Sequence, residues 1–353
     1  MTTVTIVGGG LAGLTAAFVF ENSGVDFRLI EASPVLGGRI QSVVVDRKWC
    51  GDLGPTWVWP EFQPDVVRWL QTLNIQTIEQ FETGDAVVDF TNPPSRVLLP
   101  GNHGSRRIDG GTGAIIDALR NQLSADRFVL GECVTELSSS SSGGICVSTD
   151  RGTRYESDAV VIAAPLRTVS NWMIDLDLDP ALADVLSTSP TWMAQQCKAV
   201  IRYPEPFWRD EGLSGRIASH FGPMVEVHDH ATDDSCGTLF GFVGVSPDDR
   251  ADTEGLKAAI VGQLMRCFGR RAGEPDWVVV QDWAARPHIC SRLDRMGPSI
   301  HPEVLPEIVR MGHASGRVYF AVSETSTISP GLIEGAFVSG ERAAMAVLDT
   351  LVS

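Results

Sequence analysis

Four glycines fall within six residues near the amino terminus, in the stretch VTIVGGGLAGLTAA. The residues TVTIV predict a short strand, LTAAFVFENSG predicts a helix, and DFRLIEA predicts a second buried strand. Gly8, Gly10 and Gly13 have the spacing G-x-G-x-x-G. In such a unit one glycine permits a tight turn, one lets a pyrophosphate approach the backbone, and one allows the helix to pack closely on the strand.

This succession of strand, helix and strand predicts a dinucleotide site. The free N–H groups at the start of the helix favour an anion. Glu31 closes the second strand, where a carboxylate can accept hydrogen bonds from the ribose hydroxyls of an adenosine. The alternative is a βαβ unit with a purely structural role.

The segment after the second strand indicates which dinucleotide is bound. It reads EASPVLGGRIQS and contains Gly37, Gly38 and Arg39. Two glycines let the chain fold closely over a cofactor, and a guanidinium can bind pyrophosphate oxygens as a fork. A G-G-R after a ribose-binding glutamate resembles the flavin-containing amine oxidase family, which implies FAD rather than NAD.

Two further segments carry the same resemblance. The stretch DLGPTWVWP is similar to the family segment that runs beneath the flavin ring, with Pro55 and Trp59 where the family has glycine. The resemblance implies that Gly54, Pro55 and Thr56 contact the cofactor. It also implies that Val134, in GECVTEL, lies against adenine.

The carboxyl-terminal segment is similar to the strand, acidic residue and closing helix of the family. It reads GRVYFAVSETSTISPGLIEGAFVSGERAAMAVL. The resemblance implies that Glu324 lies near the ribityl and phosphate part of FAD. The helix is predicted from Ile333, and the N–H groups around Leu332 and Ile333 are expected to face the pyrimidine edge of the flavin, where they favour the reduced state. Val322 stands where relatives have glycine and could crowd the cofactor.

Cofactor segments at both ends imply an inserted domain. We expect an α/β fold, in which a Rossmann-type FAD-binding domain carries an inserted α+β substrate domain, the two-domain architecture of amine oxidases. The FAD-binding domain is assigned to residues 1–62, 101–167 and 285–353. The substrate-binding domain is assigned to residues 63–100 and 168–284.

Lys198 is the candidate catalytic residue. It lies in CKAVIRYPEPFW, at the family's spacing before the P-F-W of residues 206–208. The resemblance implies that Lys198 holds N5 of the flavin through one water. Lysine suits this position because its ammonium is compact and its pKa falls readily on burial. The alternative is that Lys198 lies on the polar face of a strand, with Gln196 and Arg202.

Candidate substrate-cavity residues are Trp57, Trp283 and Leu332. The resemblance places both tryptophans by the cavity or the flavin, where a rigid ring attracts cations, with core packing as the alternative. Leu332 stands where many amine oxidases have one of two aromatic rings that hold the amine, and RPHICSRLD lacks the tyrosine that supplies the other. We expect this cage to be absent or rebuilt, which puts a simple monoamine substrate in doubt. Cys290 lies where some members bind FAD covalently, but its short spacing from Trp283 favours non-covalent FAD.

Composition excludes several other classes of function. A net charge of −16 argues against nucleic acid as a partner, since that affinity depends on cationic contacts to phosphate. Seven scattered cysteines without a C-x-x-C pair fit reduced thiols. His228 and His230, in EVHDHATDDSC, are interpreted as solvated loop residues, and no metal is expected. Without a signal-peptide pattern or membrane-spanning run, the mature chain is expected to begin at Met1 and to be cytoplasmic.

The resemblance implies oxidation of an amine C–N bond to an imine, with O2 reoxidising the flavin to give H2O2. The expected partners are a small-molecule amine and O2, without nucleic acid or membrane, and the oligomeric state stays open. Two alternatives remain. One is an FAD-dependent dehydrogenase or desaturase that acts on a C–C or C–O bond, which Leu332 favours. The other is a flavin-binding module with little turnover, which Val322 favours.

Overall fold

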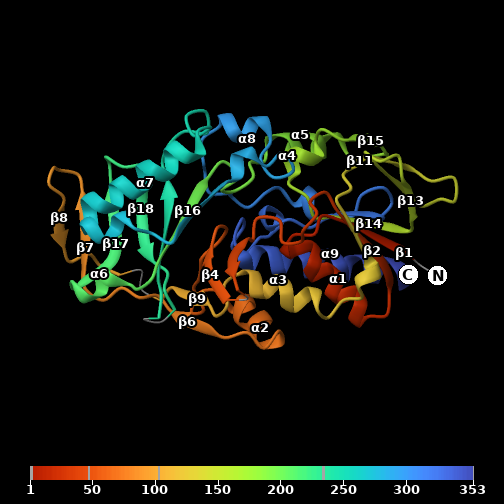
Figure 1. Cartoon of the computed structure of the whole chain (residues 1–353). Coiled ribbons are helices and arrows are strands. Elements are labelled where there is room, and N and C mark those ends of the chain that lie inside the picture. Colours follow the sequence, from red (N-terminus) through yellow and green to blue (C-terminus); the bar gives the residue numbers. More distant parts are fainter. Residues whose placement is uncertain (1–2, 47, 102–103, 233–234, 353) are drawn as a thin grey trace.

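Two groups of elements make up the computed structural model, which describes residues 3–46, 48–101, 104–232 and 235–352. The two chain termini lie close together at one end of the molecule, and the strands β7 (Asp85–Asp89), β8 (Ser95–Val97) and β17 (Leu213–Ser219) lie at the other end (Figure 1). The elements in between bring the two groups into contact.

A parallel sheet forms the first group. Its strands, in spatial order, are β10 (Phe128–Leu130), β2 (Asp26–Glu31), β1 (Thr3–Val7), β14 (Ala159–Ile162) and β21 (Val318–Phe320). The helix α1 (Leu11–Asn22) joins β1 to β2, which confirms the predicted βαβ unit. The apolar runs of β1 and β14 are buried because helices and loops cover both faces of a parallel sheet.

Both ends of the chain build this sheet. The last strand, β21, pairs in parallel with β14, and the closing helix α9 (Ile333–Val352) packs along α1 (Figure 1). The two helices approach closely at Gly340, where a Cβ atom would come within 2.3 Å of the Ala12 carbonyl oxygen. The amino-terminal unit is therefore completed only by the carboxyl-terminal segment.

A mixed sheet forms the second group. Its strands, in spatial order, are β20 (Trp277–Asp282), β16 (Cys197–Tyr203), β19 (Gly237–Val243), β18 (Met224–Asp229), β17, β7 and β8. Cys197 and Ala199 of β16 pack in one core with residues of the helix α7 (Thr253–Phe268), whereas Val200 packs with Leu53. Since side chains alternate along a strand, Lys198 shares the face of Val200. That face is turned toward the first group of elements.

Smaller elements connect the two groups. The remaining strands form three small sheets: β13 (Arg154–Ser157), β12 (Ile145–Thr149), β11 (Val134–Ser139) and β15 (Met173–Asp175); β5 (Trp57–Val58), β9 (Arg106–Ile108) and β6 (Thr77–Glu79); and β3 (Ser42–Val45) with β4 (Lys48–Asp52). The remaining α-helices are α2 (Pro64–Thr72), α3 (Gly113–Arg120), α4 (Leu166–Val169), α5 (Pro180–Thr188), α6 (Phe207–Asp210) and α8 (Arg292–Met296). In the described part of the chain, no helix has both the length and the apolar character needed to cross a bilayer.

The sheets give a physical basis for the predicted domain division. The strands of the parallel sheet all come from residues 1–62, 101–167 and 285–353, and those of the seven-stranded sheet from residues 63–100 and 168–284. The sheet of β13, β12, β11 and β15 and the small sheet of β5, β9 and β6 each join segments assigned to different domains. We propose that the domain boundaries follow the two large sheets and that this small sheet lies at their junction.

Candidate cofactor and substrate site

One cavity of about 940 Å³ lies at the carboxyl edge of the parallel sheet and reaches the seven-stranded sheet. Ligands of open α/β sheets bind at this edge, and the volume is near the upper end of the usual range of roughly 300–1,000 Å³. Most of the residues selected from the sequence line this cavity: Gly8, Gly10, Glu31, Gly38, Arg39, Gly54, Pro55, Thr56, Trp57, Val134, Lys198, Trp283, Leu332 and Ile333.

The glycine turn leaves open space in front of α1. Gly8 has φ +108°, and a Cβ atom on Gly13 would lie 2.0 Å from the Gly8 carbonyl oxygen, so larger residues fit at neither position. A Cβ atom on Gly10, by contrast, would meet nothing closer than the Gly38 Cα atom at 3.8 Å. The open side of Gly10 faces the cavity at the helix N-terminus, which fits the pyrophosphate of a dinucleotide.

Glu31 is fixed by the backbone at the end of β2. Its Oε2 atom accepts a hydrogen bond from the Gly9 N–H at 2.6 Å, and its Oε1 atom accepts one from the Ser33 N–H at 2.7 Å. Burial raises the pKa of Glu31, and these two N–H groups offset part of that rise. A carboxylate has further lone pairs, so both oxygens can still accept hydrogen bonds from ribose hydroxyls in the cavity. Gly10 and Glu31 together fit a bound dinucleotide.

Arg39 differs from the sequence expectation in one respect. Its Nη1 and Nη2 atoms donate to the two carboxylate oxygens of Glu324 at 2.7 and 2.9 Å, so the guanidinium fork binds a carboxylate of this chain. Burial alone would raise the pKa of Glu324, but the charge and hydrogen bonds of Arg39 and the Trp192 N–H lower it overall. Arg39 lines the cavity, whereas Glu324 lies behind it and is 3% exposed.

Lys198 reaches the cavity from β16 and is 3% exposed. Its Nζ atom donates to the Gly54 carbonyl oxygen at 2.6 Å and to Thr56 Oγ1 at 2.5 Å. It also lies 4.6 and 4.9 Å from the ring centres of Phe240 and Phe242. Burial lowers the pKa of Lys198 to about 7. The alternative of a solvated polar strand face is therefore wrong for this side chain.

The interpretation of the two histidines as solvated loop residues is also wrong. His228 lies in β18 and His230 directly after it, and each is 1% exposed. His230 Nε2 accepts a hydrogen bond from the Asp52 N–H at 3.1 Å, and burial lowers the pKa of His230 to about 4. Both rings pack against Phe240. Across the described residues, no group of three or more His, Cys, Asp or Glu side chains is arranged to hold a metal ion.

Aromatic and aliphatic side chains surround the Lys198 end of the cavity. Trp57 donates from Nε1 to Gln80 Oε1 at 2.8 Å, and Trp283 donates from Nε1 to the Leu53 carbonyl oxygen at 2.9 Å. Leu332 donates its backbone N–H to Ser329 at 3.1 Å, so this N–H closes a turn instead of facing the cavity. Ile333 begins α9 on the cavity wall.

Cys290 and Val322 differ in their relation to the cavity. Cys290 packs with Ala194 and Ala284 outside the lining, and burial raises its pKa to about 11, so its position gives no indication of a covalent link to FAD. Val322 does line the cavity, as its replacement of the family glycine suggested.

Sequence reasoning missed several lining residues, among them Trp192, Met193, Phe242, Arg286 and His288. Trp192 lies in the loop before β16, and its carbonyl oxygen accepts from Arg39 Nη1 at 2.9 Å. Phe242 could have been found by alternation, since it pairs directly with Lys198 across β16 and β19. The loop residues have no periodic signal that would have placed them in the wall.

Comparisons with known proteins agree with this geometry. Residues 93–348 match the model of the family "Flavin containing amine oxidoreductase", and residues 6–73 match "NAD(P)-binding Rossmann-like domain". The chain is 22% identical to "Probable flavin-containing monoamine oxidase A" of Dictyostelium discoideum, over 99% of this chain and 98% of that protein. It is 24% identical to amine oxidase [flavin-containing] B of Sus scrofa, over 73% of this chain and 50% of that protein, so it spans about half the length of that relative.

Solved structures with the same fold include two amine oxidases. Putrescine oxidase bound to putrescine superposes with a TM-score of 0.77 at 20% identity, covering 100% of this chain and 99% of that chain. Cyclohexylamine oxidase of Brevibacterium oxydans superposes with a TM-score of 0.81 at 17% identity, covering 100% of both chains. The Rossmann-type domain takes FAD as its cofactor. The chain thus belongs to the flavin-containing amine oxidoreductase family and is an enzyme of the amine oxidase type.

Proposed function

We propose that this enzyme oxidises the C–N bond of an amine to an imine, with O2 as the electron acceptor and H2O2 as the second product. The supporting observation is the buried Lys198. Its ammonium lies in the cavity wall, where it is held by Gly54 and Thr56. FAD, when bound, supplies the two-electron chemistry. The protein supplies binding, orientation and electrostatics.

Lys198 has one ammonium proton left for the cavity. Gly54 and Thr56 accept two of its three N–H bonds, and the third is available to a water or a substrate atom. With its pKa lowered to about 7, Lys198 exchanges a proton readily near neutral pH. We propose that it holds the water at N5 that the family resemblance implies.

The proposed substrate has one amine and a bulky apolar body, although Leu332 and the missing tyrosine argue against the aromatic cage that holds monoamines in many relatives, because other apolar side chains can hold the body instead. Trp57, Phe242 and Trp283 form an apolar wall near Lys198 that shields the reacting amine, and Leu332 adds apolar surface to the same cavity. Carboxylates in the described lining are Glu31, Asp117 and Glu132, which come from the end of β2, from α3 and from the turn before β11. A carboxylate binds the second ammonium of a diamine more strongly than an aromatic ring does, and the Lys198 end of the described lining offers no carboxylate.

An anaerobic substrate panel tests this proposal. The holoenzyme is mixed without oxygen with cyclohexylamine, benzylamine, putrescine, spermine and amino acids, and loss of the flavin absorbance is followed. We expect bleaching by the two apolar monoamines, weak or no bleaching by putrescine and spermine, and release of H2O2 when air is readmitted.

Each other outcome selects a different function. Bleaching by amines without H2O2 on readmission of air indicates a dehydrogenase. One relative carries that name: an L-amino acid dehydrogenase of Synechocystis is 24% identical, over 69% of this chain and 51% of that protein. Bleaching only by a non-amine substrate overturns the amine proposal. Persistent colour with every compound indicates a flavin-binding module with little turnover.

A further inference from the structure

Arg286 is a cavity cation without a carboxylate partner among the described residues. Arg39 is neutralised by Glu324, but the Nη2 atom of Arg286 donates only to the neutral amide oxygen of Gln281, at 3.1 Å. The neighbouring Asp282 pairs with Arg250 instead, at 3.3 Å. Arg286 lines the cavity and is solvent-exposed, so its positive charge faces the space that a ligand would occupy.

The segment of residues 283–289 runs along the cavity from one end to the other. At its start, Trp283 is anchored to Leu53, next to the Gly54 that binds Lys198. At its end, His288 Nδ1 lies 3.8 Å from Cys133 Sγ, and the electrostatic interaction of His288 with Glu31 acts to lower the pKa of that carboxyl. The segment thus spans the distance between the Lys198 end and the ribose end.

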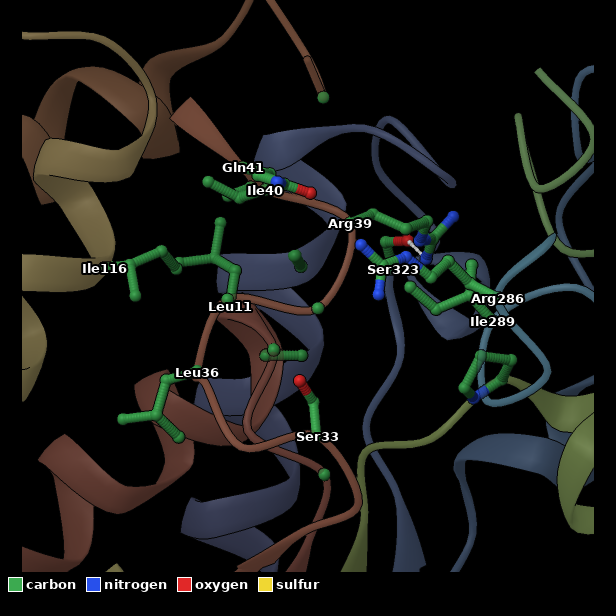
Figure 2. Close-up of a pocket in the computed structure, with 18 of the residues that line it drawn as sticks. Leu11, Ser33, Leu36, Arg39, Ile40, Gln41, Ile116, Arg286, Ile289 and Ser323 are labelled. Atoms are coloured by element: carbon green, nitrogen blue, oxygen red, sulfur yellow. Dashed lines mark hydrogen bonds between the residues drawn. The ribbon is translucent and has the colours of Figure 1, made fainter. Parts of the chain in front are cut away.

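Arg286 lies between Trp283 and His288 in this segment, and it lines the cavity with its guanidinium held at Gln281, the cross-strand neighbour of Lys198. Figure 2 shows Arg286 and Ile289 on the same side of the cavity as Arg39 and Ser323, across from Leu11 at the start of α1. The N-terminus of α1 and the open side of Gly10 form the other wall at this level. Between its adenosine ribose and its flavin ring, FAD has the pyrophosphate and the ribityl chain, and the pyrophosphate is the charged part that a guanidinium would bind.

We propose that Arg286 binds the pyrophosphate of FAD from the side opposite the glycine turn. The pyrophosphate carries two negative charges, and the helix N-terminus supplies only partial positive charge. The fork of Arg39 is occupied by Glu324, so Arg286 supplies the full positive charge that the pyrophosphate lacks. A guanidinium suits this role because its planar N–H groups match two phosphate oxygens. The inference depends on the cofactor and is independent of the substrate proposed above.

The test compares three variants of the holoenzyme. Arg286→Gln removes the charge, Arg286→Lys keeps the charge but not the fork, and Arg292→Gln removes an exposed charge from α8, outside the cavity lining. The dissociation constant of FAD is measured from flavin fluorescence on serial dilution. We expect it to rise about ten- to a hundredfold in Arg286→Gln, to rise less in Arg286→Lys, and to stay unchanged in Arg292→Gln. Added salt should weaken FAD binding less in Arg286→Gln than in the parent protein.

Three results would overturn the inference. The first is an unchanged dissociation constant of FAD in both Arg286 variants, and the second is an equal loss of FAD affinity in Arg292→Gln. The third is a higher KM for amino acids in the Arg286 variants with unaltered FAD affinity, which would assign Arg286 to a substrate carboxylate. Circular dichroism of each variant with excess FAD checks that it is folded. If Arg286→Gln does not fold, Arg286→Lys decides alone. A raised dissociation constant then supports the inference, because lysine keeps the charge but not the fork, and an unchanged one overturns it.

Discussion

At the scale of single residues, Lys198 combines burial with a cationic side chain. Its ammonium lies between two oxygen acceptors and two aromatic rings, and burial brings its pKa from 10.5 to about 7. Below that pH the side chain is protonated, and a positive charge in the cavity stabilises the negative charge that develops on O2 as it takes up electrons. The protonation state of Lys198 should thus control the reaction with O2.

The substitution Lys198→Met tests this control. We expect the variant to retain FAD and to react with O2 about a hundredfold more slowly after anaerobic reduction, as followed by stopped-flow absorbance. In the parent protein the rate constant should fall as pH rises through about 7, whereas in the variant it should not change with pH. Lys257→Met, which removes a lysine paired with Glu254 on α7, is the matched control. An unaltered rate in Lys198→Met would return the residue to a structural role.

At the scale of elements, the glycine turn separates folding from cofactor binding. Gly13 is needed for the helix to approach β1, because any Cβ atom would overlap the Gly8 carbonyl oxygen. Gly10 is extended in conformation, with φ −75° and ψ 179°, and an alanine there would have room on the protein side. The two positions therefore have different roles in one turn.

The pair Gly13→Ala and Gly10→Ala tests this separation. We expect Gly13→Ala to lower the free energy of unfolding by about 1–3 kcal/mol, seen as a lower Tm by circular dichroism. Gly10→Ala should leave the Tm of the FAD-free protein unchanged and raise the dissociation constant of FAD, because its methyl group occupies space in front of α1. Equal effects of the two substitutions on Tm would contradict the assignment.

At the scale of the whole molecule, the pair of Arg39 and Glu324 joins segments 285 residues apart. Glu324 is buried and Arg39 is 26% exposed. Since the folded pKa of Glu324 lies below its ordinary value of 4.5, its stabilising contribution is present above pH 4.5 and disappears as pH falls through the folded pKa. The contact between the two ends of the chain should weaken in acid.

Glu324→Gln tests this contact. We expect the free energy of unfolding at neutral pH to fall by about 2 kcal/mol, less than for a fully buried pair because part of Arg39 is exposed. The difference between parent and variant, measured by urea denaturation at several pH values, should shrink below pH 4.5. Glu79→Gln, which breaks an exposed pair with Arg106, should change stability by less than about 1 kcal/mol. A difference independent of pH would exclude the ion pair as its origin.

The sequence alone determined the features that depend on local spacing. The glycine turn, the βαβ unit, Glu31 at the end of β2 and the start of α9 at Ile333 all follow from short-range patterns that restrict the backbone. The resemblance of separate segments then selected FAD, and most of the residues that it named line the cavity. No folded structure was needed for these steps, because each signal lies within one segment.

Only the tertiary structure decided which side chains meet across the chain. Arg39 pairs with Glu324 although the sequence suggested a free fork, His230 is buried against Phe240 although its neighbours are polar, and residues 286–289 form a cavity wall without any periodic pattern. Such tertiary contacts leave no regular trace in the sequence, because a side chain's partner depends on how whole sheets pack. Packing of the two large sheets therefore fixes the charges around the cofactor, whereas local spacing fixes the turn that receives it.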